Sequence, residues 1–315
     1  MFAAIVRALD TPPVFGQYAE PHAGDGETVI DVLAAPLSPI VRSLAAGKHY
    51  SGSGDVGFVP GIDGVGTTPD GRRVYFLFPK PPFGSMAQRA LVSTGSIVPV
   101  PDAIPDERAA AVVTAGLSSW VALNHRSKFQ RGETVLINGA TGSAGALAVQ
   151  IAAYLGAGRI IATGRNKAKL ASLPESVVKI PLDDQANDAL RRAFSERVDV
   201  VLDYLWGEPA GRIIAAATQG RGSRAGEPRL RYVQIGSIAG ETISLSAHSL
   251  RSSGLEILGS GVGSLSMNEL VDGAEGLLAS LPDGDFDTPL KTVPLAAVED
   301  AWRDGSDDYR LVLRP

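Results

Sequence analysis

The sequence predicts an α/β protein in which a doubly wound parallel sheet follows a region rich in β-strands. Short apolar runs punctuated by Pro and Gly fill residues 1–101, a pattern typical of loop-connected strands. From Thr134 onward strand and helix patterns alternate, which indicates βαβ units with right-handed crossovers. A glycine-rich turn joins the first strand of this alternating part to an apolar helix.

The first region is predicted to consist of strands, and a long helix is expected after it. The strands are expected at 2–7, 27–34, 73–78 and 89–92. The helix is expected from Pro105 to Leu123, because Pro105 or Asp106 suits a helix start and 109–113 supplies an apolar body.

The second region is predicted to continue the alternation to its end. Strands are expected at 134–138, 159–163, 177–180, 198–204, 230–236 and 255–260, and helices at 146–155, 184–194 and 208–219. The polar, Gly- and Arg-rich segment 220–229 is expected to be an exposed loop. The tail is expected to form a helix at 267–280, a strand at 291–295, a helix at 296–303 and a last strand at 309–313, and to return to the first domain.

The glycine-rich turn has the pattern A-x-G-x-x-G, set by Ala140, Gly142 and Gly145. Gly142 would let the backbone approach a pyrophosphate, and Gly145 would let helix and strand pack closely. The helix N-terminus would present N–H groups and a positive dipole end to the phosphates. Because a strand precedes this turn and a helix follows it, we predict a nucleotide site rather than a merely structural turn. Its binding residues are expected to be Ala140, Thr141, Gly142, Ser143, Ala144 and Gly145.

The residues after the second strand of this region bear on which cofactor binds. NAD sites usually place an acid at the end of that strand, but 159–173 contains none. The guanidinium of Arg165 can bind a 2′-phosphate with two hydrogen bonds, and Lys169 adds charge. NADPH is therefore the favoured cofactor, held by Gly164, Arg165, Asn166 and Lys169. The alternative is that Arg165, Lys167 and Lys169 form a solvated basic face, which would oppose the helix dipole.

The composition narrows the class of protein. The 315 residues are 44% hydrophobic and 20% charged, enough for two domains with a sizeable core. A net charge of −5 without a long basic run argues against a nucleic-acid partner. The lack of cysteine excludes disulfides, thiolate zinc sites and cysteine nucleophiles. The N-terminus lacks a signal-peptide pattern, and no apolar run reaches the ~18 residues of a membrane span, so we expect a soluble cytoplasmic protein.

Short motifs follow one another in a recognisable order along almost the whole chain. They are Pro60–Gly66, Gly84–Ala87, Thr114–Trp120, Arg131–Leu136, Tyr232–Ser237, Arg251–Leu255 and Gly259–Gly261. This order resembles that of the zinc-independent quinone oxidoreductases of the medium-chain dehydrogenase/reductase superfamily. The resemblance implies a Rossmann cofactor domain at 104–261 and a β-rich, GroES-like catalytic domain at 1–103 and 262–315. It also implies a homodimer formed through the strand at 255–260.

A zinc site is not expected. The zinc-dependent relatives use cysteine, histidine and an acid, whereas this chain has no cysteine and carries Ile62 where the histidine of the Pro-Gly turn is usual. None of the four histidines has i,i+4 spacing with another ligand.

The resemblance implies hydride transfer from NADPH to a quinone or an α,β-unsaturated carbonyl. Negative charge then collects on the acceptor oxygen, where a hydrogen-bond donor lowers the barrier. Tyr50 is the leading catalytic candidate, and Ser38 lies where many relatives carry Asn. The alternatives are an exposed loop tyrosine and a Ser–Pro turn that starts a helix. Asp63 is expected to be structural and to hold the turn or an arginine such as Arg42.

Further cofactor contacts are expected at the carboxyl ends of the later strands, where open α/β sheets bind ligands. These residues are Tyr204, Gly236, Ser237, Ile238, Ser260 and Gly261. Thr114 is expected to approach the nicotinamide carboxamide. Tyr204 and Trp206 could instead be ordinary rim packing.

Two other functions remain open. An enoyl-thioester reductase of the same superfamily would need a basic patch for the phosphates of coenzyme A or phosphopantetheine. Arg221, Arg224, Arg229 and Arg231 could form one, or they could be only solvated. A non-catalytic NADPH-binding or sensing protein would carry the same binding motifs.

Overall fold

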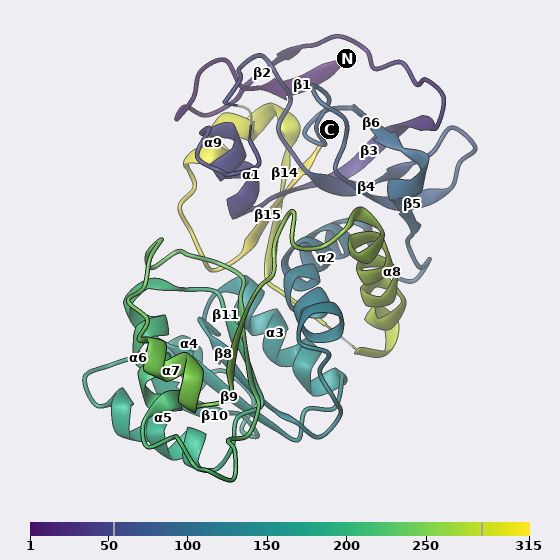
Figure 1. Ribbon diagram of the computed structural model, residues 1–315. Helices are drawn as coiled ribbons and strands as arrows, with labels where there is room; N and C mark the ends of the chain where they lie inside the picture. Colours follow the sequence, from purple (N-terminus) through teal and green to yellow (C-terminus); the bar gives the residue numbers. More distant parts are fainter. Residues whose placement is uncertain (53, 285) are drawn as a thin grey trace. The chain divides into compact units, whose positions relative to one another are not determined.

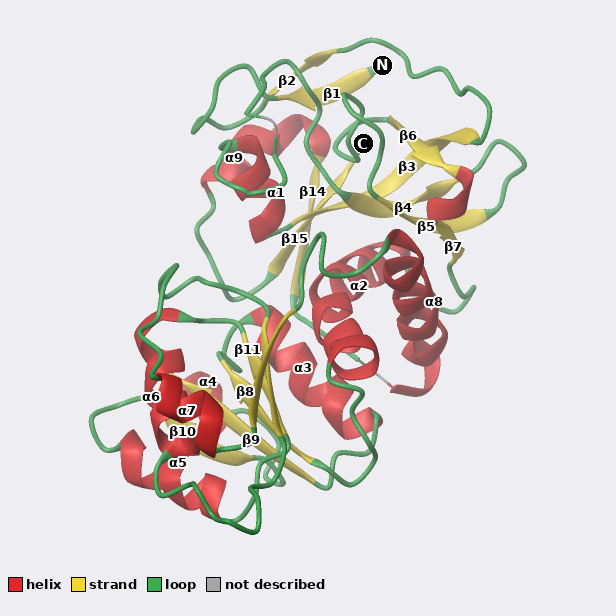
Figure 2. Cartoon of the chain, in the orientation of Figure 1, coloured by secondary structure: helices red, strands yellow, loops and turns green. Residues whose placement is uncertain are grey.

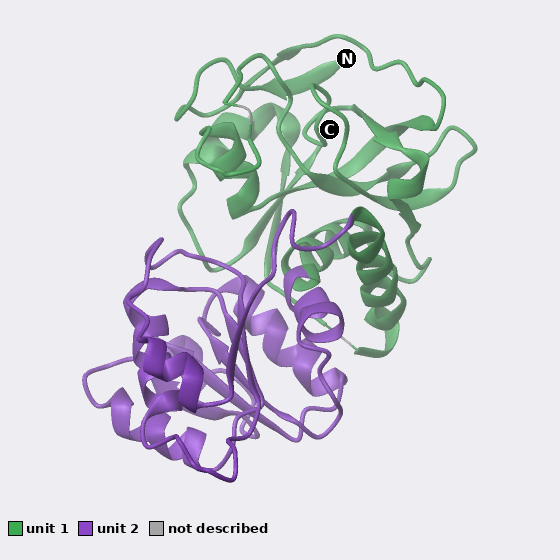
Figure 3. Ribbon diagram, in the orientation of Figure 1, with its two compact units in different colours: residues 1–117, 267–315 green, residues 118–266 purple. Residues whose placement is uncertain are grey.

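The computed structural model describes residues 1–52, 54–284 and 286–315, which form two compact units (Figure 3). The first unit comprises Met1–Leu117 and Met267–Pro315, and the second comprises Ser118–Ser266. The division of roles between a catalytic and a cofactor domain stays a prediction from the sequence.

The first unit is built on a mixed sheet with the strand order β14-β15-β3-β4-β5-β7, in which β6 also pairs with β3 (Figure 1). A separate antiparallel pair is formed by β1 and β2. The tail returns to this unit as predicted, because β15 pairs antiparallel with β3. The strands are β1 (Phe2–Ile5), β2 (Val14–Gln17), β3 (Glu27–Leu37), β4 (Asp63–Thr67), β5 (Arg73–Leu77), β6 (Arg89–Ser93), β7 (Ile97–Pro99), β14 (Leu290–Pro294) and β15 (Arg310–Arg314).

Helices complete the first unit. They are α1 (Pro39–Ala45), α8 (Met267–Gly284), α9 (Val298–Arg303) and the first part of α2 (Asp106–Val121), which continues into the second unit and ends in a π-helical turn at 122–126. An apolar core that includes Ile30, Phe76 and Met86 packs between the strands and α9, whose Val298 is also buried.

The strand β4 was not predicted, because its sequence Asp-Gly-Val-Gly-Thr indicates a turn. The structure gives the reason for the glycines. A Cβ on Gly66 would lie 2.4 Å from the carbonyl oxygen of Asp31, and one on Gly64 would lie 2.8 Å from that of Ala34. The neighbouring strand β3 therefore approaches too closely for side chains, and its register shifts between Val32 and Ala34 at this point.

The second unit contains a parallel sheet, of which Figure 2 labels β8, β9, β10 and β11. Its strand order is β10-β9-β8-β11-β12-β13. Numbered along this unit the order is 3-2-1-4-5-6, that of a doubly wound dinucleotide-binding sheet. The strands are β8 (Thr134–Asn138), β9 (Arg159–Gly164), β10 (Val178–Pro181), β11 (Val200–Asp203), β12 (Leu230–Gln234) and β13 (Leu255–Gly259). The α/β fold class predicted from the sequence is confirmed.

Helices cover both faces of this sheet, with α3 on one side and α5 and α6 on the other (Figure 1). The helices are α3 (Ser143–Tyr154), α4 (Lys167–Ala171), α5 (Ala186–Ser195), α6 (Gly207–Thr218) and α7 (Ala247–Ser252), of which α7 was not predicted. Leu136, Leu190 and Ile213 lie in one buried core between the sheet and the pair α5–α6. In the described part of the chain, no helix is both long and apolar enough to cross a membrane.

Candidate functional site

The turn after β8 presents unpaired backbone donors at the start of α3. Gly142 is the N-cap residue, and no side chain caps the helix. The first backbone hydrogen bond of the helix runs from Ala146 N to Gly142 O at 2.8 Å. The N–H groups of Ser143, Ala144 and Gly145 therefore have no partner within the helix and are available to an anion.

Two glycines next to this turn are required by close packing. A Cβ on Gly145 would lie 2.2 Å from Gly139 O, which shows that helix and turn touch backbone to backbone. A Cβ on Gly164, at the end of β9, would lie 2.6 Å from the Thr141 side chain. By contrast, a Cβ on Gly142 would have no protein atom closer than 3.7 Å, so the space beside the helix start is open. Ala140 is fully buried under the turn.

Basic side chains follow β9 on the adjacent strand. Arg165 is exposed, and no ion pair or hydrogen bond of its side chain is found among the residues described. Lys167 is committed elsewhere, since its ammonium lies 2.8 Å from Asp183. Asn166 caps α4 by accepting from Lys169 N at 3.0 Å. The arrangement leaves the guanidinium of Arg165 available to an anionic ligand.

A buried polar network ties the carboxyl ends of four strands together around Asp203. Its Oδ1 accepts from Asn138 Nδ2 at 2.7 Å, and its Oδ2 accepts from the Tyr232 hydroxyl at 2.8 Å. Thr163 Oγ1 in turn donates to Asn138 Oδ1 at 2.8 Å. Burial raises the pKa of Asp203, although these donors favour the ionised form. The network thereby fixes the strand ends beside the turn, and it was not predicted from the sequence.

Asp203 also shapes the turn that follows β11. It accepts from the backbone N–H groups of Leu205 at 2.9 Å and of Trp206 at 3.2 Å. Trp206 has a φ of 54°, a conformation that is costly for a bulky residue. Burial raises the pKa of Tyr204 to about 12. The Tyr204 hydroxyl is therefore neutral and lies inside the unit.

The remaining predicted cofactor residues lie at the same edge. A Cβ on Gly236 would meet Tyr204 O at 2.7 Å, so the ends of β11 and β12 are in contact. Ser237 Oγ donates to Glu241 at 3.1 Å, while Ile238 is 84% exposed. Ser260 N donates to Gln234 O at 2.8 Å, and Gly261 N donates to the Ser264 hydroxyl at 2.8 Å. The structure thus brings these residues together at the carboxyl edge of one sheet.

The two catalytic candidates lie in the first unit and differ in environment. Tyr50 is 72% exposed, and its ring lies tilted against that of His49 with 4.2 Å between ring centroids. Ser38 is the N-cap residue of α1, yet its side chain makes no cap hydrogen bond. Its hydroxyl is buried without a partner among the described residues. The Ser38 hydroxyl is therefore buried without a partner among the described residues, whereas the Tyr50 side chain is accessible to solvent.

Asp63 holds a different set of partners from those expected. Its Oδ2 accepts hydrogen bonds from the Tyr75 hydroxyl and from Thr114 Oγ1, the latter at 2.6 Å. The expected contact with Arg42 is wrong. Arg42 instead donates to the carbonyl oxygens of Ala301, Trp302 and Asp304 near the end of α9.

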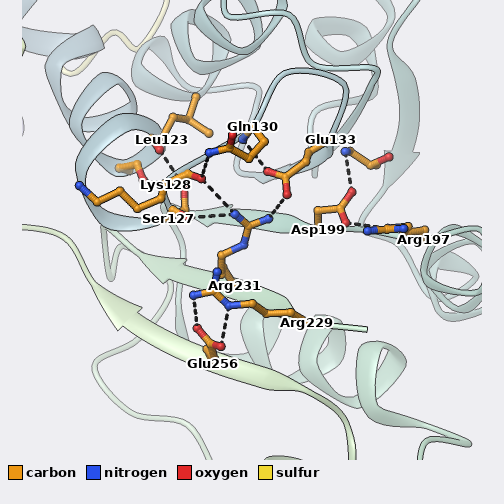
Figure 4. Close-up of polar contacts among 12 residues, drawn as sticks. Leu123, Ser127, Lys128, Gln130, Glu133, Arg197, Asp199, Arg229, Arg231 and Glu256 are labelled. Carbon is orange, nitrogen blue, oxygen red and sulfur yellow. Dashed lines mark hydrogen bonds and ion pairs between the residues drawn. The ribbon is translucent and has the colours of Figure 1, made fainter. Parts of the chain in front are cut away.

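Three of the four arginines of the predicted basic patch, Arg221, Arg229 and Arg231, are paired with the protein's own carboxylates. Arg224 is exposed, and no ion pair of its side chain is found among the residues described. Figure 4 shows the buried Arg231 between Glu133 and the carbonyl oxygen of Ser127, and Arg229 paired through two nitrogens with Glu256.

Arg221 is likewise paired, with Glu227 at 3.0 Å. It lines a cavity of about 450 Å³ near the amino-terminal ends of β11 and β12. The other arginines of that cavity are also paired, Arg191 with Asp188 at 3.1 Å and Arg197 with Asp199 at 2.7 Å. The three arginines that line this cavity therefore all take part in internal ion pairs.

No cluster of potential metal ligands occurs among the residues that the structure describes.

The fold and the residues at the carboxyl edge of the parallel sheet are those of the dinucleotide-binding α/β proteins. Comparison with known proteins narrows this class. No family model matches the chain. It is 28% identical, over the full length of both proteins, to a probable NADPH-dependent quinone reductase from Emericella nidulans. It is 32% identical, over 62% of its length, to a polyketide synthase subunit from Mycobacterium tuberculosis, of which the match spans only 9%.

Solved structures give the same result. The quinone oxidoreductase from Thermus thermophilus, also determined with NADPH, matches over the whole of both chains with a TM-score of 0.80 and 26% identity. A probable oxidoreductase from Mycobacterium abscessus matches with a TM-score of 0.79 and 25% identity, covering 99% of that chain. The chain is thus similar over its whole length to quinone oxidoreductases, as its motifs predicted.

Proposed function

We propose that the protein is an NADPH-dependent oxidoreductase that transfers a hydride to a quinone or an α,β-unsaturated carbonyl without zinc. The full-length likeness to a probable NADPH-dependent quinone reductase supports this function. The single observation that carries it lies at the carboxyl edge of the parallel sheet. There, N–H groups at the start of α3 lie one strand away from Arg165, and neither these groups nor the Arg165 side chain has a partner among the residues described.

The residues present fit this cofactor. The open space beside Gly142 would admit a pyrophosphate, which the N–H groups of Ser143, Ala144 and Gly145 would bind. Arg165, with Lys169, would bind the 2′-phosphate. When bound, NADPH supplies the hydride, and the protein orients the reactants and excludes water.

The chain must also stabilise the charge that develops on the acceptor oxygen. We propose Tyr50 and Ser38 as donors for this purpose, since one hydroxyl is accessible and the other lacks a partner among the described residues. Thr114 is proposed to lie against the nicotinamide. Each of these three roles is a proposal from the family resemblance.

The first experiment is an assay of NADPH oxidation at 340 nm with 1,4-benzoquinone, 9,10-phenanthrenequinone and a short enone, repeated with NADH. Arg165→Ala should remove the preference for NADPH, a change of about tenfold to a hundredfold because a charge-assisted pair is worth about 1.5–3 kcal/mol. Lys167→Ala is the matched control, since Lys167 is exposed but paired with Asp183. Equal effects of the two substitutions would favour a general basic face over a 2′-phosphate site.

The second candidate function is enoyl-thioester reduction, because several relatives are polyketide synthases. Adding crotonyl-coenzyme A to the acceptor panel separates the two, and turnover on the thioester alone would replace the quinone proposal. Saturable NADPH binding with no turnover on any acceptor would instead favour a binding or sensing protein.

We also propose that the protein is a homodimer. β13 is an edge strand of the parallel sheet and carries the apolar residues Leu255, Ile257 and Leu258. An exposed edge of this kind invites pairing with a second copy. Light scattering after size exclusion should give a mass near twice 32.7 kDa, and a monomer would refute the proposal. A cytoplasmic location is likewise proposed from the sequence.

A further inference from the structure

Asp63 is a buried carboxyl group whose partners come from different elements of the first unit. The residue is 3% exposed and begins β4. Its Oδ2 accepts from the Tyr75 hydroxyl on β5 and from the Thr114 hydroxyl on α2. Its Oδ1 is buried without a hydrogen-bond partner in the described part of the chain. A buried, half-satisfied carboxyl group is uncommon in native structures and is frequently functional.

The charged and titratable groups around Asp63 do not neutralise it. Arg310, on β15, attracts the carboxylate without a hydrogen bond to it, and Tyr75 keeps its proton because burial raises its pKa well above 10. Burial raises the pKa of Asp63 to about 6, against the effect of Thr114, Tyr75 and Arg310. Asp63 therefore exchanges a proton close to neutral pH.

The protonation state of Asp63 decides the direction of the Thr114 hydroxyl. An ionised carboxylate only accepts, so both hydroxyl groups must point their hydrogens inward. A protonated carboxyl group can donate to Thr114 Oγ1, which frees the hydrogen of Thr114 to point elsewhere. The Tyr75 side chain is fully buried, so its hydroxyl hydrogen cannot turn toward a bound acceptor. Thr114 is only partly buried, so its hydroxyl hydrogen can.

We propose that Asp63 and Thr114 form the relay that delivers the proton completing the reduction, an inference that rests on the function proposed above. After the acceptor has received a hydride, its oxygen holds an additional electron pair. The O–H bond of Thr114 breaks and its proton bonds to that oxygen, while the carboxyl proton of Asp63 bonds to Thr114 Oγ1. Asp63 is left as a carboxylate and regains a proton from solvent before the next turnover, so one hydride and one proton are consumed.

The test is the pH dependence of kcat/KM between pH 5 and 9, with NADPH and 9,10-phenanthrenequinone. For the unmodified protein, activity should fall about tenfold per pH unit above a value near 6. Asp63→Asn should be slow and independent of pH over this range. Thr114→Val should lose about a hundredfold or more at pH 6, because general acid catalysis contributes at least that much, and Thr114→Ser should restore most of it.

The Tyr75→Phe substitution tests the direction in which the pH profile of activity moves. It removes a donor that favours the carboxylate, so the pH at which activity falls should move upward. NADPH affinity, measured by fluorescence titration, should stay within about twofold in the Asp63 and Tyr75 variants, which separates proton delivery from cofactor binding.

The outcomes distinguish this relay from the proposed function itself. If the unmodified protein oxidises no NADPH with any acceptor, the proposed function fails. If it turns over but shows the same pH profile as Asp63→Asn, or if Thr114→Val is as active as Thr114→Ser, the relay is refuted and the enzyme activity stands. Should Asp63→Asn fail to fold, the Thr114 pair still decides the question.

Discussion

Replacing Asp63 by asparagine should remove a pH dependence from the stability of the folded chain. Burial raises the pKa of Asp63 from 3.8 to about 6, so the folded state keeps the proton to higher pH than the unfolded state. Because the folded pKa is the higher one, the stabilising contribution is complete below pH 3.8 and is lost as the pH rises through about 6. The whole difference corresponds to about 3 kcal/mol, since one pKa unit is about 1.4 kcal/mol.

The assay is urea-induced unfolding followed by circular dichroism at pH 5, 6, 7 and 8. Over that range the free energy of unfolding of the unmodified protein should fall by about 1.4 kcal/mol relative to Asp63→Asn, the rest of the effect lying below pH 5. Asp70→Asn is the control, because hydrogen bonds from Thr68 and Arg72 lower the pKa of that exposed residue. Parallel pH dependences for the unmodified protein and Asp63→Asn would refute the argument that an ionised Asp63 is costly.

Three further substitutions test the second unit. Gly145→Ala places a Cβ 2.2 Å from Gly139 O, so unfolding free energy should fall by about 1–3 kcal/mol and NADPH affinity should weaken, as measured by urea unfolding and fluorescence titration. Asp203→Ala leaves several buried donors without their acceptor and should lower the free energy of unfolding in urea by about 3 kcal/mol or more, and Asp203→Asn should lower it less. Arg231→Met leaves Glu133 without its ion-pair partner and should cost about 3 kcal/mol by the same measurement, which a double substitution with Glu133→Gln should partly restore.

Local patterns were sufficient to predict the first strand, the glycine turn and the following helix of the second unit. The strand predicted at 134–138 coincides with β8, because five consecutive apolar or β-compatible residues end directly in a glycine turn. The helix after it starts at Ser143, three residues before the prediction, because Gly142 already serves as the N-cap. Each of these signals lies within about ten residues of the element that it predicts.

What could not be predicted depends on contacts between distant residues. Asp63 and Thr114 are 51 residues apart in sequence, and Asp203 and Tyr232 are 29 apart. No periodicity relates such pairs, because their meeting depends on strand order and register. The arginines of 220–231 looked like a basic patch for the same reason, since Glu256 and Glu133, which neutralise two of them, lie on other strands or loops. One signal was available, as Asn138 and Asp203 each end an apolar strand of a parallel sheet.

Aspartates fix the strand β11 to its neighbour β8 at both ends. At its start, Asp199 accepts from Thr134 N on β8 at 2.9 Å. At its end, Asp203 accepts from Asn138 on the same neighbouring strand. With only four residues β11 has few ladder hydrogen bonds, so these side chains help to set its register against β8, and a one-residue slip would reverse every side chain.

The two aspartates should therefore differ in what their loss changes. Asp203→Ala frees the end of β8, from which the glycine turn begins, and should weaken NADPH binding although Asp203 itself is buried beneath the turn. Asp199→Ala acts at the opposite end of the strands and should lower stability while leaving the affinity of the folded protein for NADPH within about twofold. Fluorescence titration at a temperature where both variants remain folded compares them. If both variants lose the same affinity for NADPH, the register of β11 determines cofactor binding, and the position of its carboxyl end does not.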